Sequence, residues 1–254
     1  MSEQTHPFHL QNVSKTYPGS PPVLALDGVS LQVGAGEFVA LVGPSGCGKS
    51  TLLSLLAGIE PPDSGTITQG PRSLIGNRET VGYMLQDDLL FPWMTILDNV
   101  ALPLRVTGQP LGQARRQAAE QLAAFGLEAY AAAYPAALSG GMRQRAAFLR
   151  TQLTGRPLLA LDEPFARLDA LTRLQMQQWL LTHWENTRPG ILLVTHDIDE
   201  AIYLADRIYV MSPRPGRIVA TLTVPLERPR HMTQRTEPAF STLKANILHL
   251  LVTA

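Results

Sequence analysis

The sequence predicts an α/β fold with a mostly parallel sheet, and two observations lead to this prediction. Short apolar runs typical of buried strands alternate with longer segments of helical character along most of the chain. One apolar run, residues 37–42, leads into a glycine-rich turn that a leucine-rich helical segment follows. Strands and helices that alternate in this way form parallel sheets whose two faces are covered.

The individual elements follow from composition and spacing. Alternating or continuous apolar residues predict strands at residues 8–13, 29–33, 37–42, 158–161, 191–194 and 207–211. Helical spacing or composition predicts helices at residues 52–58, 111–125, 139–153, 169–183 and 197–205, and Ser139 is an expected N-cap. From Glu237 onward, Phe240, Leu243, Ile247 and Leu250 share one helical face, so we expect this last helix to pack on the body of the protein.

The central part of the chain has a different composition, rich in Ala, Gln and Arg with few β-branched residues. This composition favours helix. We therefore predict a core formed by residues 1–87 and 156–225, a helical subdomain inserted at residues 88–155, and a short C-terminal helical tail at residues 226–254.

Composition excludes several classes of protein. Of 254 residues, 45% are apolar and 17% charged, which indicates a large buried core rather than disorder. Lys plus Arg (21) equals Asp plus Glu (21), so the chain lacks the basic character of a nucleic-acid-binding protein. No run approaches the roughly 18 apolar residues of a membrane span, and a single cysteine, Cys47, excludes an internal disulfide. We expect a soluble, cytosolic protein whose membrane role, if it has one, depends on a partner.

Residues 43–50 match the complete phosphate-loop pattern, G-x-x-x-x-G-K-[ST], between a predicted strand and a predicted helix. The glycines allow backbone N–H groups to converge on phosphate oxygens, and the helix adds the positive end of its dipole. Lys49 is expected to reach the β- and γ-phosphates, and the hydroxyl of Ser50 to bind Mg²⁺. The residues predicted to bind ATP here are Gly43, Pro44, Ser45, Gly46, Cys47, Gly48, Lys49, Ser50 and Thr51. The alternative, a turn that only joins strand to helix, does not explain the Lys-Ser pair.

Two adjacent carboxylates, Asp162 and Glu163, follow an apolar strand. Such a pair is costly unless a cation uses it, so Asp162 is a predicted Mg²⁺ ligand and Glu163 is placed to polarise an attacking water. His196 follows another apolar strand and is expected to face the same crevice, where it would contact the γ-phosphate. On its own it would be an ordinary core or surface histidine.

Three further residues have weaker signals. Gln86 lies between the predicted core and the helical subdomain. Tyr17 is a candidate to stack on adenine, although an ordinary aromatic residue is an equally good interpretation. Cys47 is expected to be a small filler in the loop rather than a nucleophile, because no base accompanies it.

A second glycine-rich turn, residues 138–145 (LSGGMRQR), precedes Asp162 and Glu163 in the chain. Its Ser-Gly-Gly sequence at a helix start offers unpaired N–H donors to an anion. This turn suggests an ATP site that is complete only when a partner supplies the segment.

Together these motifs resemble the nucleotide-binding subunits of ABC transporters in order and spacing, over about residues 8–224. The resemblance implies a P-loop NTPase (RecA-like) fold with an N-terminal antiparallel β region, and two subunits packed head to tail with ATP and Mg²⁺. It also implies that Ser139, Gly140 and Gly141 contact the γ-phosphate on the opposite subunit, and that Glu163 is the general base. The remaining implied roles concern His196 as γ-phosphate sensor, Asp169 as the link between the two sites, and Gln86 as a metal ligand and lever toward the membrane subunit.

Three stretches, residues 90–100, 168–177 and 212–218, resemble the ATPases of nitrate, sulfonate and taurine importers, a branch that includes importers of thiamine pyrimidine precursors. The implied partners are a second copy of the ATPase, integral membrane permease subunits and a periplasmic or lipid-anchored solute-binding protein, with no nucleic acid. The implied location is the cytoplasmic face of the inner membrane. Trp93 is interpreted either as part of a docking groove for the membrane subunit or as a core residue of the helical subdomain.

Met142 and Arg167 depart from the family's usual residues, Gln and a small residue, and residues 149–151 replace the usual Ala-Arg-Ala. None of these changes removes a phosphate or metal ligand, but a large cation at position 167 is expected to affect coupling between sites. Three other functions are alternatives: an ABC ATPase for export or lipoprotein release, a nucleic-acid-linked ABC ATPase, and a small-molecule kinase. The importer-like 213–216 stretch argues against export or lipoprotein release. The neutral net charge argues against a nucleic-acid-linked ATPase, and the 138–145 turn argues against a kinase.

Overall fold

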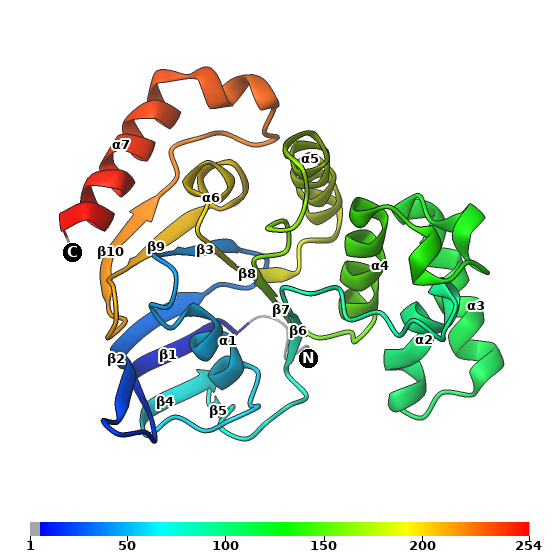
Figure 1. Ribbon diagram of the computed structural model, residues 1–254, viewed down its shortest axis with the longest axis horizontal. Coiled ribbons are helices and arrows are strands. Elements are labelled where there is room, and N and C mark those ends of the chain that lie inside the picture. The colour runs from blue at the N-terminus through cyan, green and yellow to red at the C-terminus, as the bar shows by residue number, and fades with distance from the viewer. Residues whose placement is uncertain (1–5, 254) are drawn as a thin grey trace.

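A six-stranded sheet with strand order β10-β9-β3-β8-β7-β6 runs through the centre of the protein (Figure 1). The structure is a computed structural model that describes residues 6–253. The strands of this sheet are β3 (Phe38–Val42), β6 (Val81–Met84), β7 (Leu158–Asp162), β8 (Gly190–Thr195), β9 (Arg207–Met211) and β10 (Ile218–Thr223). Neighbouring strands pair in parallel except β10, which is antiparallel to β9. The predicted mostly parallel sheet is therefore confirmed.

A second, antiparallel sheet has the order β2-β1-β4-β5. It consists of β1 (Phe8–Tyr17), β2 (Val23–Val33), β4 (Ser64–Gln69) and β5 (Arg72–Ser73). The first two strands are longer than the sequence pattern indicated, and β4 and β5 were not predicted. Gly65 of β4 has φ 89°, and a Cβ there would lie 2.4 Å from the carbonyl oxygen of Asn12, so only glycine permits this approach of β4 to β1.

The central sheet separates two hydrophobic cores, because successive side chains of its strands point to opposite faces. In β3, Val39 and Leu41 belong to the core shared with the antiparallel sheet and the helix α1 (Lys49–Leu56). Phe38, Ala40 and Val42 belong to the core on the other face, shared with the helices α5 (Ala170–Thr187), α6 (Ile198–Leu204) and α7 (Pro238–Thr253). The strands β3, β7 and β8 are buried at every position, which is why they appear in the sequence as continuous apolar runs.

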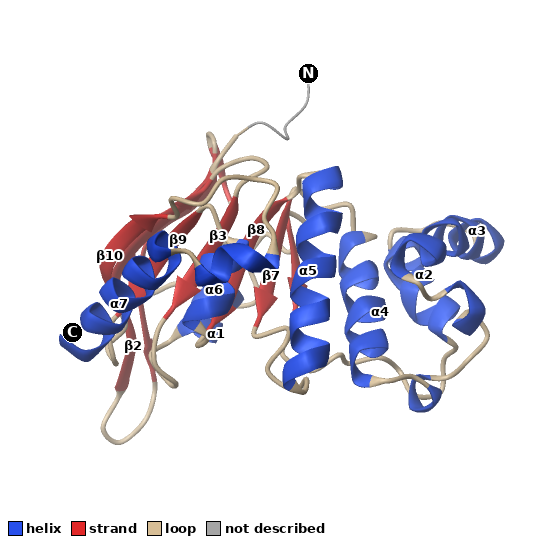
Figure 2. Ribbon diagram, turned by 90° about the horizontal axis from the view of Figure 1, so that it is seen from above, coloured by secondary structure: helices blue, strands red, loops and turns tan. Residues whose placement is uncertain are grey.

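The described residues contain seven α-helices. They are α1 (Lys49–Leu56), α2 (Ile96–Val106), α3 (Leu111–Leu122), α4 (Gly140–Gln152), α5 (Ala170–Thr187), α6 (Ile198–Leu204) and α7 (Pro238–Thr253). Helices α2, α3 and α4 form a lobe on one side of the sheet (Figures 1 and 2). The sequence pattern missed α2, which contains Pro103.

The loop before α2 carries an exposed tryptophan. Asn99, which is fully buried, bonds to the backbone of Phe91, Met94 and Thr95 and so holds this loop in place. The side chain of Trp93 is nevertheless 70% exposed and contacts the ring of Phe91. The interpretation of Trp93 as a core residue is therefore wrong: its loop is anchored by Asn99 rather than by the indole.

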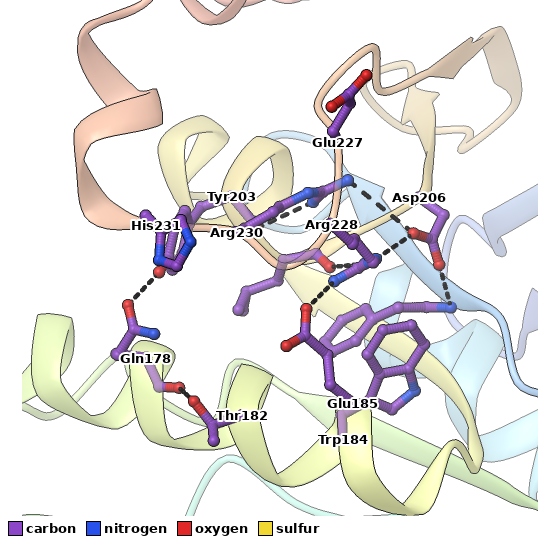
Figure 3. A network of polar contacts seen from close by, with 12 residues as sticks. Gln178, Thr182, Trp184, Glu185, Tyr203, Asp206, Glu227, Arg228, Arg230 and His231 are labelled. Atoms are coloured by element: carbon purple, nitrogen blue, oxygen red, sulfur yellow. Dashed lines mark hydrogen bonds and ion pairs between the residues drawn. The ribbon is translucent and has the colours of Figure 1, made fainter.

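The C-terminal tail is anchored to the body by two arginines (Figure 3). Arg230 is 2% exposed and donates to the carbonyl oxygens of Ile202 and Tyr203 at 3.1 and 2.9 Å, and burial lowers its pKa to about 10. Arg228 lies over the ring of Trp184 and donates to Asp206 at 2.7 Å. Beyond this anchor, α7 buries the predicted apolar face against the α6 side of the core, with Leu250 partly buried.

Between residues 6 and 253, none of the helices is both long enough and apolar enough to span a membrane.

Candidate nucleotide site

The phosphate loop connects β3 to α1 as the sequence predicted. Gly48 forms the N-cap of α1 with φ 106°, and a Cβ there would lie 2.8 Å from the carbonyl oxygen of Ala25. Lys49 is 5% exposed, and its Nζ lies 2.9 Å from the carbonyl oxygens of both Gly43 and Pro44. The loop is therefore wound around the ammonium group, which places a positive charge where the backbone N–H groups converge.

A pocket of about 400 Å³ opens over this loop. It brings together Tyr17, Val23, Ala25, Ser45, Gly46, Gly48, Lys49, Ser50, Thr51, Gln86, Glu163 and Arg214. A volume of this size suits a nucleotide. Cys47 is 1% exposed and packs beneath the loop, as expected for a filler residue, and burial raises the pKa of its thiol.

Asp162 ends β7 and is 7% exposed. Burial raises the pKa of its carboxyl group, although hydrogen bonds from Ser50 and Tyr83 oppose the shift. The Tyr83 hydroxyl donates to Asp162 Oδ2 at 3.2 Å, and burial raises the pKa of this phenol well above its usual value. Ser50 and Gln86 line the pocket, and Asp162, which does not, is hydrogen-bonded to Ser50. All three carry oxygen donors, the donor type that Mg²⁺ prefers.

Glu163 and His196 lie in direct contact. The distance from His196 Nδ1 to Glu163 Oε2 is 2.8 Å, with the histidine side chain 56% exposed and the glutamate side chain 17% exposed. Glu163 has φ 44°, an unusual backbone conformation for a residue with a side chain, and its N–H donates to the carbonyl of Val194 in β8. The ends of β7 and β8 therefore hold this pair at the edge of the pocket.

Tyr17 ends β1 and lines the pocket together with Val23, its pairing partner in β2, and Ala25. Its hydroxyl donates to Glu60 at 2.6 Å, and burial raises its pKa. This bond holds the ring at the pocket wall, where an adenine can stack on it.

The 138–145 turn lies apart from the pocket. Ser139 is exposed and caps α4 by accepting from the N–H of Met142 at 3.3 Å, which confirms the predicted N-cap. A Cβ on Gly141 would lie 2.9 Å from Thr172 of α5, so this glycine allows α4 to pack closely. Ser139, Gly140, Gly141 and Asp169 are absent from the residues that line the pocket, and α4 stands well to one side of α1 in both views (Figures 1 and 2).

Three arginines hold the loop that follows Gln86. Arg150 donates to the carbonyl oxygens of Asp88 and Leu89 at 2.6 and 2.7 Å, and Arg143 donates to the Asp88 carboxylate at 3.1 Å. Arg167 forms an ion pair with Asp87. Gln86 itself is exposed and lines the pocket. The residues that follow it are fixed by the three arginines.

Sequence reasoning missed four residues around the site. Tyr83 is 79 residues from Asp162, its hydrogen-bond partner, and Arg214 is distant in the chain from the phosphate loop whose pocket it lines. The 213–216 stretch was noted for its resemblance to importers, but no local pattern marks Arg214 as a pocket residue. Glu200 is 4% exposed and lies with Arg173 beside Glu163 and His196. Its position after Asp197, the N-cap of α6, was readable as a capping signal but not as part of the site.

A phosphate loop between a buried strand and a helix, with an acidic pair at the end of another parallel strand of the same sheet, defines a P-loop NTPase. The comparisons with known proteins narrow this class. A model of the family described as "ABC transporter" matches residues 26–166. The chain therefore belongs to the ABC transporter family, and it is an ATPase subunit of that family.

Two relatives illustrate the similarity. The chain is 45% identical over 244 residues to the formylaminopyrimidine import ATP-binding protein ThiZ of Halalkalibacterium halodurans, covering 95% of each chain. It is 48% identical over 217 residues to the taurine import ATP-binding protein TauB of Chromobacterium violaceum, covering 85% of this chain and 82% of the relative. Among solved structures, the dimeric ATP-binding cassette MJ0796 with ADP and phosphate matches with a TM-score of 0.75 and 31% identity, over 87% of this chain and 100% of that one.

Proposed function

We propose that this chain powers the import of a small solute, as a dimer in which each ATP lies between the phosphate loop of one subunit and the 138–145 turn of the other. One observation carries this proposal. The phosphate loop, Gln86 and Glu163 line a single pocket, whereas the exposed Ser139 turn of the same chain does not reach it. The similarity to a cassette solved as a dimer supports the same arrangement.

Within this pocket, binding is assigned to two groups of residues. Tyr17 stacks on the adenine, and the loop from Gly43 to Thr51 holds the phosphates through backbone N–H groups and Lys49. The donors Ser50, Gln86 and Asp162 fit Mg²⁺, which when bound would neutralise charge on the phosphates. In the second subunit, Ser139, Gly140 and Gly141 present N–H groups and a hydroxyl to the γ-phosphate.

Hydrolysis is assigned to Glu163 and His196. The Glu163 carboxylate accepts a proton from a water whose oxygen attacks the γ-phosphorus, and the bond from that phosphorus to the bridging oxygen of ADP breaks. His196, 2.8 Å from Glu163, orients this carboxylate and contacts the γ-phosphate. Asp169, exposed at the N-cap of α5, is assigned to the contact between the two sites.

The membrane subunits are proposed to bind at the loop from Gln86 to Met94. This loop exposes Leu89 and Trp93 while Asn99 and Arg150 hold its backbone, so it offers an apolar surface that does not need to reorganise. The chain would lie at the cytoplasmic face of the inner membrane, and a solute-binding protein on the other side would deliver the solute.

The names of two relatives suggest taurine or a formylaminopyrimidine as the solute class. Nitrate, other sulfonates and thiamine pyrimidine precursors are further candidates from the sequence resemblance alone. They do not favour export or lipoprotein release. The test is to purify the ATPase with the membrane subunits and solute-binding protein of its own organism, in lipid vesicles, and to measure ATP hydrolysis with each solute. With the ATPase inside the vesicles and the solute-binding protein outside, stimulated ATP hydrolysis and accumulation of the solute inside the vesicles support import. Movement of the solute out of the vesicles in this orientation contradicts it.

A further inference from the structure

The segment between β9 and β10, residues 212–217, has no role in the mechanism above, yet it contributes Arg214 to the pocket. The segment is closed on itself. Ser212 N donates to the carbonyl of Arg217 at 2.9 Å, Arg217 N donates to Ser212 Oγ at 3.0 Å, and Ser212 Oγ lies 3.1 Å from the carbonyl oxygen of Pro215. Arg214 is therefore presented from a turn with a defined backbone.

This turn is also fixed against the pocket wall. Gly216 N donates to the carbonyl of Ala25 at 2.9 Å, and Asp27 N donates to the carbonyl of Gly216 at 3.0 Å. A Cβ on Gly216 would lie 2.2 Å from the carbonyl oxygen of Cys47, so the turn contacts the phosphate loop directly. Ala25 lies two residues along β2 from Val23, the pairing partner of Tyr17, and its carbonyl oxygen would lie 2.8 Å from a Cβ on Gly48. The turn therefore meets the pocket wall between Tyr17 and the phosphate loop.

The two arginines of the turn differ in their partners. Arg217 donates to Asp27 at 2.9 Å. For Arg214, which is exposed, the described part of the chain supplies no hydrogen bond or ion pair, so its guanidinium group is available to a ligand. A guanidinium group binds phosphate oxygens with paired, charge-assisted hydrogen bonds.

We propose that Arg214 binds the α-phosphate of the nucleotide. The proposal rests on the assignment of the pocket to ATP under the proposed function. A nucleotide with its base at Tyr17 and its β- and γ-phosphates in the phosphate loop places its ribose and α-phosphate at the junction where the turn meets the wall. Arg214 is then a nucleotide-binding residue that the phosphate-loop pattern does not include.

The test measures binding of ATP, AMP and adenosine to the purified chain by competition with a fluorescent ATP analogue. Arg214→Ala is expected to weaken the binding of ATP and AMP by about tenfold and to leave the binding of adenosine unchanged. Arg217→Ala is the matched control, because Arg217 belongs to the same turn but points to Asp27 rather than to the pocket. This variant is expected to bind ATP, AMP and adenosine with the affinities of the wild type.

Unchanged ATP and AMP affinity in Arg214→Ala overturns the proposal, as does an equal loss for adenosine or an equal loss in Arg217→Ala. Lys49→Ala separates this result from failure of the proposed function. If Lys49→Ala binds ATP normally, the pocket itself is wrongly assigned; if it loses ATP while Arg214→Ala does not, only the role of Arg214 fails.

Discussion

His196 Nδ1 lies 2.8 Å from Glu163 Oε2, a contact that joins the ends of β8 and β7 across 33 residues of sequence. Glu163 sits in a left-handed backbone conformation, φ 44°, which is costly for a residue with a side chain and is typical of functional sites. The contact limits the orientations available to the carboxylate, so the histidine acts on hydrolysis through Glu163 as well as through phosphate.

His196→Ala is therefore expected to lower kcat by roughly 100-fold and to weaken ATP binding far less, because the phosphate loop and Lys49 line the pocket and hold the nucleotide, whereas His196 makes one contact with the γ-phosphate. Steady-state hydrolysis and equilibrium ATP binding measure the two effects separately. A variant with wild-type kcat would show that the contact has no part in catalysis.

Ser139→Arg is expected to abolish hydrolysis while each subunit still binds ATP, because the substituted side chain blocks the turn but lies outside its own subunit's pocket. Ser139→Ala is the control for helix stability. It removes the cap on the Met142 N–H, costs about 1 kcal/mol of stability, and adds no bulk. Loss of ATP binding in Ser139→Arg would mean that the turn supports the fold of its own subunit.

The sequence predicted β3, β7, β8 and β9 because these strands are buried at nearly every position, whereas the two edge strands, β6 and β10, were not predicted. Five successive apolar residues in β3 and four in β8, Ile191 to Val194, leave little ambiguity. The strand β4 was missed because Ile67 is its one buried apolar residue, and its strand conformation depends on pairing with β1. Local sequence cannot report a pairing partner that lies more than 50 residues away.

The same distinction applies to the site. The phosphate loop, Ser139 and the Asp162-Glu163 pair were predictable because each motif contains its own chemistry within a few residues. Tyr83 meets Asp162 from 79 residues away, and Arg214 reaches the pocket only because Gly216 pairs with Ala25. The ion pair that Arg167 forms with Asp87 is equally a product of tertiary structure.

This ion pair links the loop that precedes Asp169 with the loop that follows Gln86. We expect Arg167→Ala to leave basal ATP hydrolysis within about twofold and stability within about 1 kcal/mol, since exposed ion pairs contribute little to folding. In the complete transporter, stimulation by the solute-binding protein should fall. Asp87→Ala should behave in the same way, and the double variant should show no further loss; additive losses would contradict a shared role.

Glu200 gives the stability of the protein a pH dependence. Burial raises its pKa to about 8 from an ordinary value of 4.5, with Asp197 contributing and Arg173 opposing. The folded protein keeps the carboxyl group protonated where the unfolded chain ionises it, so this group reduces stability progressively as pH rises from 4.5 to 8.

Glu200→Gln removes this ionisation and keeps the shape of the side chain. Its free energy of unfolding should exceed that of the wild type at pH 8.5, by up to roughly 5 kcal/mol, and the difference should shrink toward pH 4.5. Urea denaturation across this range measures it. Parallel stability profiles for the two proteins would show that Glu200 is ionised in the folded state.

The central claim is that ATP joins two copies of this chain and that Glu163 is needed to release them. The most direct measurement is the molar mass of Glu163→Gln in solution with ATP and Mg²⁺, by size exclusion with light scattering. We predict a dimer with ATP and a monomer with ADP, and a monomer in both conditions when Ser139→Arg is added to the same chain. A Glu163→Gln protein that binds ATP yet remains a monomer would contradict the account.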